Sequence, residues 1–169
     1  HDAAVDRARK LIRKGADIID IGGESTRPGS EPVPAPEEKR RVIPVIEALS
    51  EQDDAPISID TRKSEVAEAA IDAGADIVND VSALTHDPEM GALVADREVP
   101  VCLMHMQGTP ENMQDNPTYD EVVTDVRDWL SRRLDAALEA GIDEDRTLVD
   151  PGFGFGNTVQ HNPQLMRRL

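Results

Sequence analysis

Short apolar runs alternate with longer amphipathic stretches along most of this chain. Most of the apolar runs end in a polar residue, and the stretches between them repeat hydrophobic residues three and four positions apart, as one face of a helix requires. Residues 2–14 place Ala4, Ala8 and Leu11 on one such face, and Gly15 ends the stretch. The pattern therefore predicts helices that alternate with strands.

Five apolar runs read as strands, and they cover residues 16–21, 57–60, 76–80, 99–105 and 147–150. Besides residues 2–14, helices are expected over residues 36–49, 64–74, 88–97 and 119–140 and from residue 162 onward. Pro44 implies a kink or a late start in the second helix, and Thr61 or Ser64 is the expected cap of the third.

Regular alternation of strands and helices is typical of a parallel sheet. The segment Gly15-Ala-Asp-Ile-Ile-Asp20 returns as Gly74-Ala-Asp-Ile-Val-Asn79, so the chain repeats an αβ unit. We therefore expect an α/β fold, a (β/α)8 TIM barrel, with a doubly wound open sheet as the alternative. Because only five strands are found, we expect a partial barrel that lacks the first strand and the last two. We expect residues 1–169 to form one domain that is truncated at both ends.

Composition restricts the partners more than the chemistry. The net charge is −16, from 34 acidic and 18 basic residues, which argues against a nucleic-acid partner. An acidic surface of this kind favours a halophilic, salt-accumulating host. The single cysteine, Cys102, excludes an internal disulfide and fits a cytoplasmic location. No apolar run is long enough to predict a membrane span.

Polar side chains lie at or next to the carboxyl ends of most of the predicted strands: Asp20, Asp60, Asn79 and Asp150. In a barrel these strand ends share one mouth, where polar residues are typical of an active site. Taken singly, each is more often a turn former or a helix cap. Together, with no lysine at the same positions, they favour a ligand rich in N–H donors, such as a pteridine or a purine. Met104 can supply an apolar face to a flat ring.

The loop DIGGESTRPGS, residues 20–30, brings a carboxylate, hydroxyls and the Arg27 guanidinium together. An arginine among exposed backbone amides suits a phosphate or diphosphate, although an ordinary surface turn has the same composition. Phe153 and Phe155 lie in a glycine-rich run and form either a ligand wall or a plug of the barrel rim. His105 is interpreted as a hydrogen-bonded rim residue. The histidines and Cys102 have no metal-ligand spacing, and no P-loop occurs.

Five blocks now point to a known family: IDIGGESTRPGS, ISIDTRKSEV, GADIVNDVSAL, PVCLMHMQGTPENMQ and LVDPGFGFGNTVQHN. In order and spacing they resemble dihydropteroate synthase, a pterin-binding family. The resemblance covers essentially the whole chain, and GGESTRPG and DPGFGFG are specific to that family. It implies a barrel enzyme of folate biosynthesis that joins 6-hydroxymethyl-7,8-dihydropterin diphosphate to 4-aminobenzoate and releases 7,8-dihydropteroate and diphosphate.

The resemblance also implies roles for single residues. Asp150 would bind the pterin 2-amino and N3 hydrogens, and Asp60, Asn79 and Met104 would also surround the pterin. Thr26, Arg27 and Pro28 would lie over the diphosphate and the aminobenzoate. Phe155 would lie beside the aminobenzoate. Asp60 and Arg27 are the implied catalytic residues. Mg²⁺ is expected with the diphosphate, sulfonamides are expected to bind in place of aminobenzoate, and the full-length protein is expected to be a homodimer.

Some features of the family pattern are missing. No metal ligand is expected within the chain, because the Mg²⁺-binding Asn would lie before residue 1. Asn157 stands where the family usually has Lys. We therefore expect the isolated chain to be inactive. The alternatives are a pterin-dependent methyltransferase domain, a degenerate pterin-binding module without chemistry, and a structural fragment without a ligand.

Overall fold

The computed structural model describes residues 1–27, 29–113, 117–157 and 161–168. In these ranges five strands form one parallel sheet in the order β1-β2-β3-β4-β5. They are β1 (Ile19–Gly22), β2 (Ile57–Asp60), β3 (Ile77–Asp80), β4 (Val101–Met104) and β5 (Thr147–Asp150). The helices are α1 (Asp2–Ile12), α2 (Ala35–Ser50), α3 (Ser64–Asp72), α4 (Met90–Arg97), α5 (Val122–Glu139) and α6 (Asn162–Arg168), with a 3-10 turn, η1 (Glu144–Arg146).

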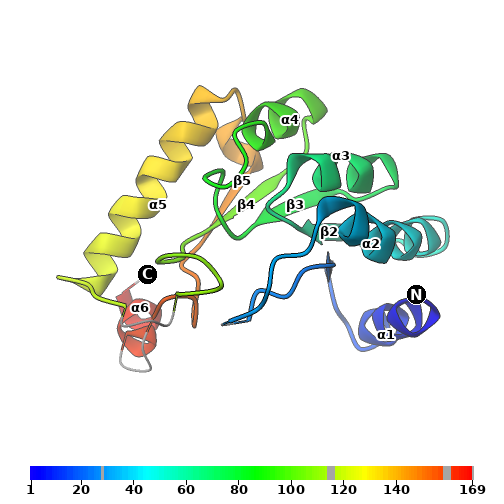
Figure 1. Ribbon diagram of the computed structural model, residues 1–169, viewed down its shortest axis with the longest axis horizontal. Helices are drawn as coiled ribbons and strands as arrows, with labels where there is room; N and C mark the ends of the chain where they lie inside the picture. The colour runs from blue at the N-terminus through cyan, green and yellow to red at the C-terminus, as the bar shows by residue number, and fades with distance from the viewer. Residues whose placement is uncertain (28, 114–116, 158–160, 169) are drawn as a thin grey trace.

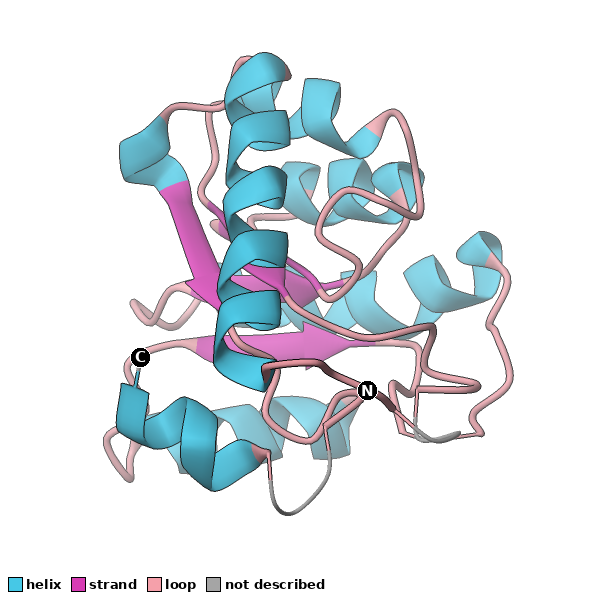
Figure 2. Ribbon diagram, turned by 90° about the vertical axis from the view of Figure 1, so that its left-hand side faces the viewer, coloured by secondary structure: helices cyan, strands magenta, loops and turns pink. Residues whose placement is uncertain are grey.

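Sequential strand order decides between the two architectures that the sequence left open. A doubly wound sheet reverses its strand order at a switch point and carries helices on both faces. Here each strand pairs with the next one along the chain, and α2 to α5 follow one another along one side of the sheet (Figure 1). Viewed from the side, α5 crosses in front of the strands (Figure 2). The fold is a segment of a (β/α)8 barrel, as predicted.

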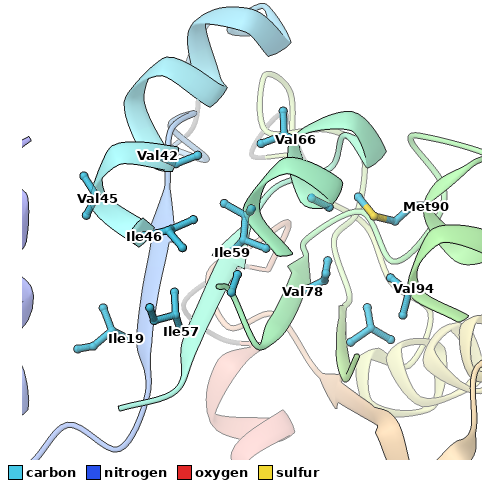
Figure 3. Packing of buried hydrophobic residues seen from close by; sticks show 14 of the residues in the cluster. Ile19, Val42, Val45, Ile46, Ile57, Ile59, Val66, Val78, Met90 and Val94 are labelled. Carbon is cyan, nitrogen blue, oxygen red and sulfur yellow. The ribbon is translucent and has the colours of Figure 1, made fainter. Parts of the chain in front are cut away.

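The hydrophobic core lies between the sheet and this helical layer (Figure 3). Ile59, Val78 and Leu103 of the three central strands are completely buried. They face buried helix residues, among them Ile46, Val66 and Val94. Burial of each large side chain contributes about 1.5–3 kcal/mol, so this face supplies most of the driving force for folding. The opposite side of each strand is left for polar residues, because side chains alternate along a strand.

The strands β1 and β5 are the edges of the described sheet. Leu148 and Val149 of β5 are 51% and 52% exposed, whereas Ile59 of β2 is fully covered. The β5 edge therefore leaves more apolar surface in contact with water than the centre of the sheet does.

Two helix details differ from the sequence prediction. The helix α2 begins before Pro44, at Ala35, so the expected late start is wrong. Proline has no amide hydrogen, and the Arg40 carbonyl oxygen, which an amide at position 44 would bond, lies 3.0 Å from His1 Nε2. The N-cap residue of α3, Lys63, makes no side-chain cap, so the expected capping by Thr61 or Ser64 is wrong. The amide of Ser64, the first residue of α3, instead donates to Asp87 Oδ2 at 2.7 Å. Thr61 instead donates its hydroxyl to a carboxylate of α2.

The longest helix begins later than the pattern indicated. Its expected start was Tyr119, but α5 begins at Val122, because the Glu121 side chain caps it by accepting the Thr124 amide at 2.8 Å. None of the described helices combines the length and the apolar composition that a membrane span requires.

Candidate active site at the carboxyl ends of the strands

The strand-end side chains named from the sequence lie on one side of the sheet. Asp60 pairs in register with Asn79, and Met104 pairs in register with Asp150, so each pair sits on neighbouring strands. The Asn79 amide nitrogen lies 3.4 and 3.5 Å from the two carboxylate oxygens of Asp20, across the intervening strand β2. The structure thus brings Asp20, Asp60 and Asn79 together.

Asp60 sits in an electrostatic environment that opposes its ionisation. Burial, together with the nearby carboxylates of Asp20, Glu38, Asp80 and Glu24, raises its pKa from 3.8 to about 7. Near neutral pH the carboxyl group therefore exchanges between a form that donates a hydrogen bond and a form that only accepts. A ligand with N–H donors would favour the ionised form, because it replaces the repulsion by hydrogen bonds.

Backbone geometry leaves room for the Asp60 carboxylate. Gly22 is opposite Asp60 in the β1–β2 register, and a Cβ at position 22 would approach Asp60 Oδ2 to 3.2 Å. The next glycine, Gly23, packs still more closely, since its Cβ would lie 2.9 Å from Glu38 Cγ. The double glycine that the sequence showed is therefore needed for close approach of the chain to β2 and α2.

The loop after β1 carries three of the sequence-predicted residues. Thr26 is partly buried and Arg27 is exposed, while Pro28 lies outside the described residues. The Arg27 carbonyl accepts the Ser30 amide at 3.1 Å, and the Gly29 amide donates to Pro110 O at 3.2 Å. The loop is thus folded on itself and contacts the loop that follows β4.

The glycine-rich loop after β5 is held by its own strand end. Asp150 Oδ1 accepts the Gly152 amide at 2.8 Å, which leaves its other carboxylate oxygen for a ligand. Gly152 has φ +67°, and a Cβ there would lie 1.9 Å from the carbonyl oxygen of His105. Gly156 is similarly tight against Gln107. The glycines at 152 and 156 thus let this loop pack on the loop after β4.

The two phenylalanines of this loop behave differently. Phe155 packs against a buried cluster that includes Met104 and Met106, whereas Phe153 is 44% exposed. Asn157 is only 3% exposed and donates from Nδ2 to the Gly152 carbonyl at 2.8 Å, and its Oδ1 has no partner among the described residues. Asn157 therefore belongs to the inside of the loop, a position that its polar side chain alone did not reveal.

His105 does not have the hydrogen-bonded rim position expected from the sequence. It is 4% exposed, its Nδ1 has no partner in the described part of the chain, and it packs edge-on against Trp129 with ring centroids 5.0 Å apart. Burial lowers the pKa of this imidazole to about 4, so it is neutral at physiological pH. Because β4 side chains alternate, His105 turns toward α5 while Met104 turns toward the strand-end carboxylates.

Cavities border the site without coinciding with the carboxylates. One of about 610 Å³ lies beside the start of α5 and is lined in part by His105, Tyr119 and Trp129. A smaller one of about 180 Å³ lies under the loop after β1, between Ser30, Arg62 and Pro110. Neither is lined by Asp60, Asn79 or Asp150, which instead line the open inner side of the sheet.

Comparison with known proteins gives the same assignment along the whole chain. The family model described as pterin binding enzyme matches residues 1–169. The chain is 47% identical over 168 residues to dihydropteroate synthase of Escherichia coli K12, covering 98% of this chain and 58% of that protein. It is 49% identical over 166 residues to the Streptococcus pyogenes serotype M1 protein of the same name, covering 98% and 60%. The chain thus spans roughly 60% of the length of these curated relatives.

Solved structures match as well. A Yersinia pestis dihydropteroate synthase in complex with a sulfonamide drug superposes with a TM-score of 0.95 at 44% identity, covering 98% of this chain and 60% of that one. The Xanthomonas albilineans dihydropteroate synthase with 4-aminobenzoic acid gives a TM-score of 0.92 at 52% identity, covering 99% and 59%. With the strand order and the two glycine loops described above, these matches show that the chain belongs to the pterin binding enzyme family.

Proposed function

We propose that the full-length protein containing this chain is a dihydropteroate synthase of folate biosynthesis. It condenses 6-hydroxymethyl-7,8-dihydropterin diphosphate with 4-aminobenzoate to form 7,8-dihydropteroate and diphosphate. The observation that carries this proposal is that two family loops, GGESTRPG and DPGFGFG, follow strands that end in carboxylates of one parallel sheet, and that both contact the segment after β4. The relatives reported above carry the same name, which favours the synthase over a pterin-dependent methyltransferase or a non-catalytic module.

The pterin would lie against the inner side of the strands. Its 2-amino and N3 hydrogens would donate two parallel bonds to Asp150, whose second oxygen remains available. Asp60 and Asn79, adjacent in register, would bind the remaining polar edge of the ring. Met104 would cover one ring face, since it borders Asp150 in the register.

The second substrate and the leaving group would lie under the loops. Arg27, with Thr26 and Pro28, would bind the diphosphate and close over the aminobenzoate, because a guanidinium suits phosphate oxygens. Phe155 would form part of the aminobenzoate wall. Its packing against the buried cluster that contains Met104 supports this role, because Met104 lies on the proposed pterin side.

The chemistry requires little from the protein beyond position and charge. The bond between the pterin methylene carbon and the diphosphate oxygen breaks, and its electron pair leaves with the diphosphate. Electron donation from the pterin ring stabilises the methylene cation, and Asp60 in its ionised form would stabilise the same positive charge. The aminobenzoate amine then forms the new C–N bond and loses one proton. The chain's residues orient the ring, neutralise the leaving group and exclude water.

We also propose that Mg²⁺ accompanies the diphosphate. Within the described ranges, no three His, Cys, Asp or Glu side chains gather in a way that could hold a metal ion. The described side chains therefore do not form a metal site of their own, and the chemistry above uses none. The remaining features of this proposal are a homodimer, a cytoplasmic location and inhibition by sulfonamides at the aminobenzoate position.

Calorimetric titration of pterin diphosphate with Mg²⁺ in molar salt tests the proposal. The full-length protein should bind, the Asp150→Asn variant should not, and the wild type should form dihydropteroate when 4-aminobenzoate is added. The isolated 169-residue chain should show no turnover. Absence of pterin binding by the full-length protein would overturn the assignment, and binding without turnover would favour the non-catalytic module.

A further inference from the structure

Four charged side chains form a nearly buried network beneath the loop after β1. We call it the Glu24 network: Glu24, Glu38, Arg62 and Lys63. The Glu24 and Glu38 side chains are 8% and 0% exposed, and those of Arg62 and Lys63 are 12% and 18% exposed. Lys63 Nζ donates to Glu24 Oε2 at 2.8 Å and also to Glu38, while Arg62 donates to the other oxygen of Glu24.

Charge balance within the network depends on Glu24. Two carboxylates meet two cations, and the guanidinium of Arg62 has Glu24 as its ion-pair partner in the described chain. The Arg62 Nε is buried without a described partner, so no other group there compensates for the loss of Glu24. Burial alone would raise the pKa of Glu24, but the bonds from Lys63, the Val33 amide and Arg62 outweigh it and lower the pKa to about 2. Glu24 is therefore a permanent anion.

The same carboxylate closes the base of the loop. Glu24 Oε2 accepts the backbone amide of Val33 at 2.7 Å, which joins the two ends of the segment 24–33. On the other side of Glu24, the Gly23 carbonyl accepts Arg41 Nη1 at 2.9 Å. The entry and the exit of the loop are thus tied to each other and to α2.

Glu24 also connects this loop to the strand that carries Asp60. Arg62 and Lys63 belong to the turn that follows Asp60, and Thr61 of that turn donates to Glu38 Oε1 at 2.7 Å. A shift of the turn after Asp60 would therefore move the base of the loop after β1, and a shift of that loop would move the turn. Arg27 lies within the segment that Glu24 closes, three residues beyond it.

We propose that Glu24 is a positioning residue of the synthase: it holds the segment 25–33, and with it Arg27, over the diphosphate and aminobenzoate by tying that segment to the turn after Asp60. The proposal rests on the proposed function, and it gives Glu24 no contact with substrate. Loss of the tie should weaken the use of 4-aminobenzoate and leave the pterin side of the site intact.

Two variants separate the parts of the tie in the full-length protein. Glu24→Gln removes the ion pairs, and Val33→Pro removes only the amide donor; a residue before Pro34 is already restricted to extended backbone that proline adopts. Glu31→Gln is the matched control, because this exposed carboxylate lies in the same loop and has no ion pair among the described residues. Steady-state kinetics with 4-aminobenzoate, calorimetric binding of 6-hydroxymethyl-7,8-dihydropterin, which lacks the diphosphate that Arg27 would bind, and hydrogen exchange of residues 25–33 are measured for each.

Glu24→Gln and Val33→Pro should each lower kcat/KM for 4-aminobenzoate about tenfold, mostly through KM, because misplaced binding groups weaken productive alignment. The affinity of both variants for the pterin should change less than about threefold. In Glu31→Gln, both kcat/KM and pterin affinity should stay within about threefold of the wild type. Wild-type kcat/KM in either variant, or an equal loss of pterin affinity and kcat/KM, would overturn the proposal. If Glu24→Gln fails to fold, Val33→Pro decides.

Hydrogen exchange separates this inference from the proposed function. If the wild type shows no turnover, the synthase assignment fails, but exchange in residues 25–33 still reports the tie. Faster exchange in Glu24→Gln and Val33→Pro, with Glu31→Gln unchanged, would support Glu24 as the residue that holds the loop. Unchanged exchange in both variants would refute it.

Discussion

Two glycines of the loop after β5 provide a matched test of close backbone packing. Gly152 and Gly154 both have positive φ, +67° and +87°, but their surroundings differ. A Cβ at 152 would lie 1.9 Å from the His105 carbonyl oxygen, whereas at 154 no described atom lies within 4 Å. Substitution of each by alanine therefore applies the same backbone penalty, and only the substitution at 152 adds a steric clash.

The expected magnitudes follow from these two terms. A left-handed conformation costs an L-residue about 1–2 kcal/mol, and the stiffer unfolded chain returns about 0.4–1 kcal/mol, so Gly154→Ala should destabilise by about 1 kcal/mol. At 152 the backbone oxygen must also move by about 1.5 Å to reach the ordinary contact distance of 3.4 Å. Because β4 and the Asp150 turn hold that oxygen in place, we expect Gly152→Ala to cost about 3 kcal/mol more.

Urea unfolding followed by circular dichroism gives the free energy of unfolding of both variants. Unchanged m-values would show that the same cooperative unit unfolds in each case. A difference between Gly152→Ala and Gly154→Ala of less than about 1 kcal/mol would refute the reasoning, because it would mean that the two loops separate without cost.

Three further predictions concern charge and polarity. The pKa of Asp60 is raised, so the stability that this carboxyl group contributes is complete below pH 3.8 and is lost as the pH rises to about 7. Asp60→Asn should remove this pH dependence and should stabilise the chain above pH 7 by at most about 4 kcal/mol. Urea unfolding from pH 4 to 8 measures both effects. Asn157→Ala removes the bond to the Gly152 carbonyl and should cost about 1–3 kcal/mol in the same assay. With a net charge of −16, the chain should gain thermal stability as the KCl concentration rises from 0.1 M toward roughly 1 M, because salt screens like-charge repulsion. The three predictions would be contradicted, respectively, by a stability of the wild type that does not depend on pH, by an unchanged free energy of unfolding in Asn157→Ala, and by a thermal stability that does not depend on salt.

Sequence periodicity determined the order of the elements. The apolar runs that end at Asp60, Asn79 and Asp150 form strands. A strand between two helices needs apolar residues for its buried face and a polar residue at its end, and both are visible in the local sequence. The convergence of these side chains also followed, since parallel strands direct their carboxyl ends to one edge. The start of α5 was missed because Glu121 is not an obvious cap residue, and its side chain competes successfully for the first free amides.

Tertiary structure alone decided how distant side chains are paired. Glu24 meets Arg62 and Lys63, which are 38 and 39 residues further along the chain, and no periodicity links these positions. The burial of Asn157 and the turn of His105 toward α5 likewise depend on the packing of loops that follow different strands. A one-dimensional pattern reports which face of its own element a residue occupies, whereas ion pairing and loop packing depend on the three-dimensional approach of elements that the pattern does not describe.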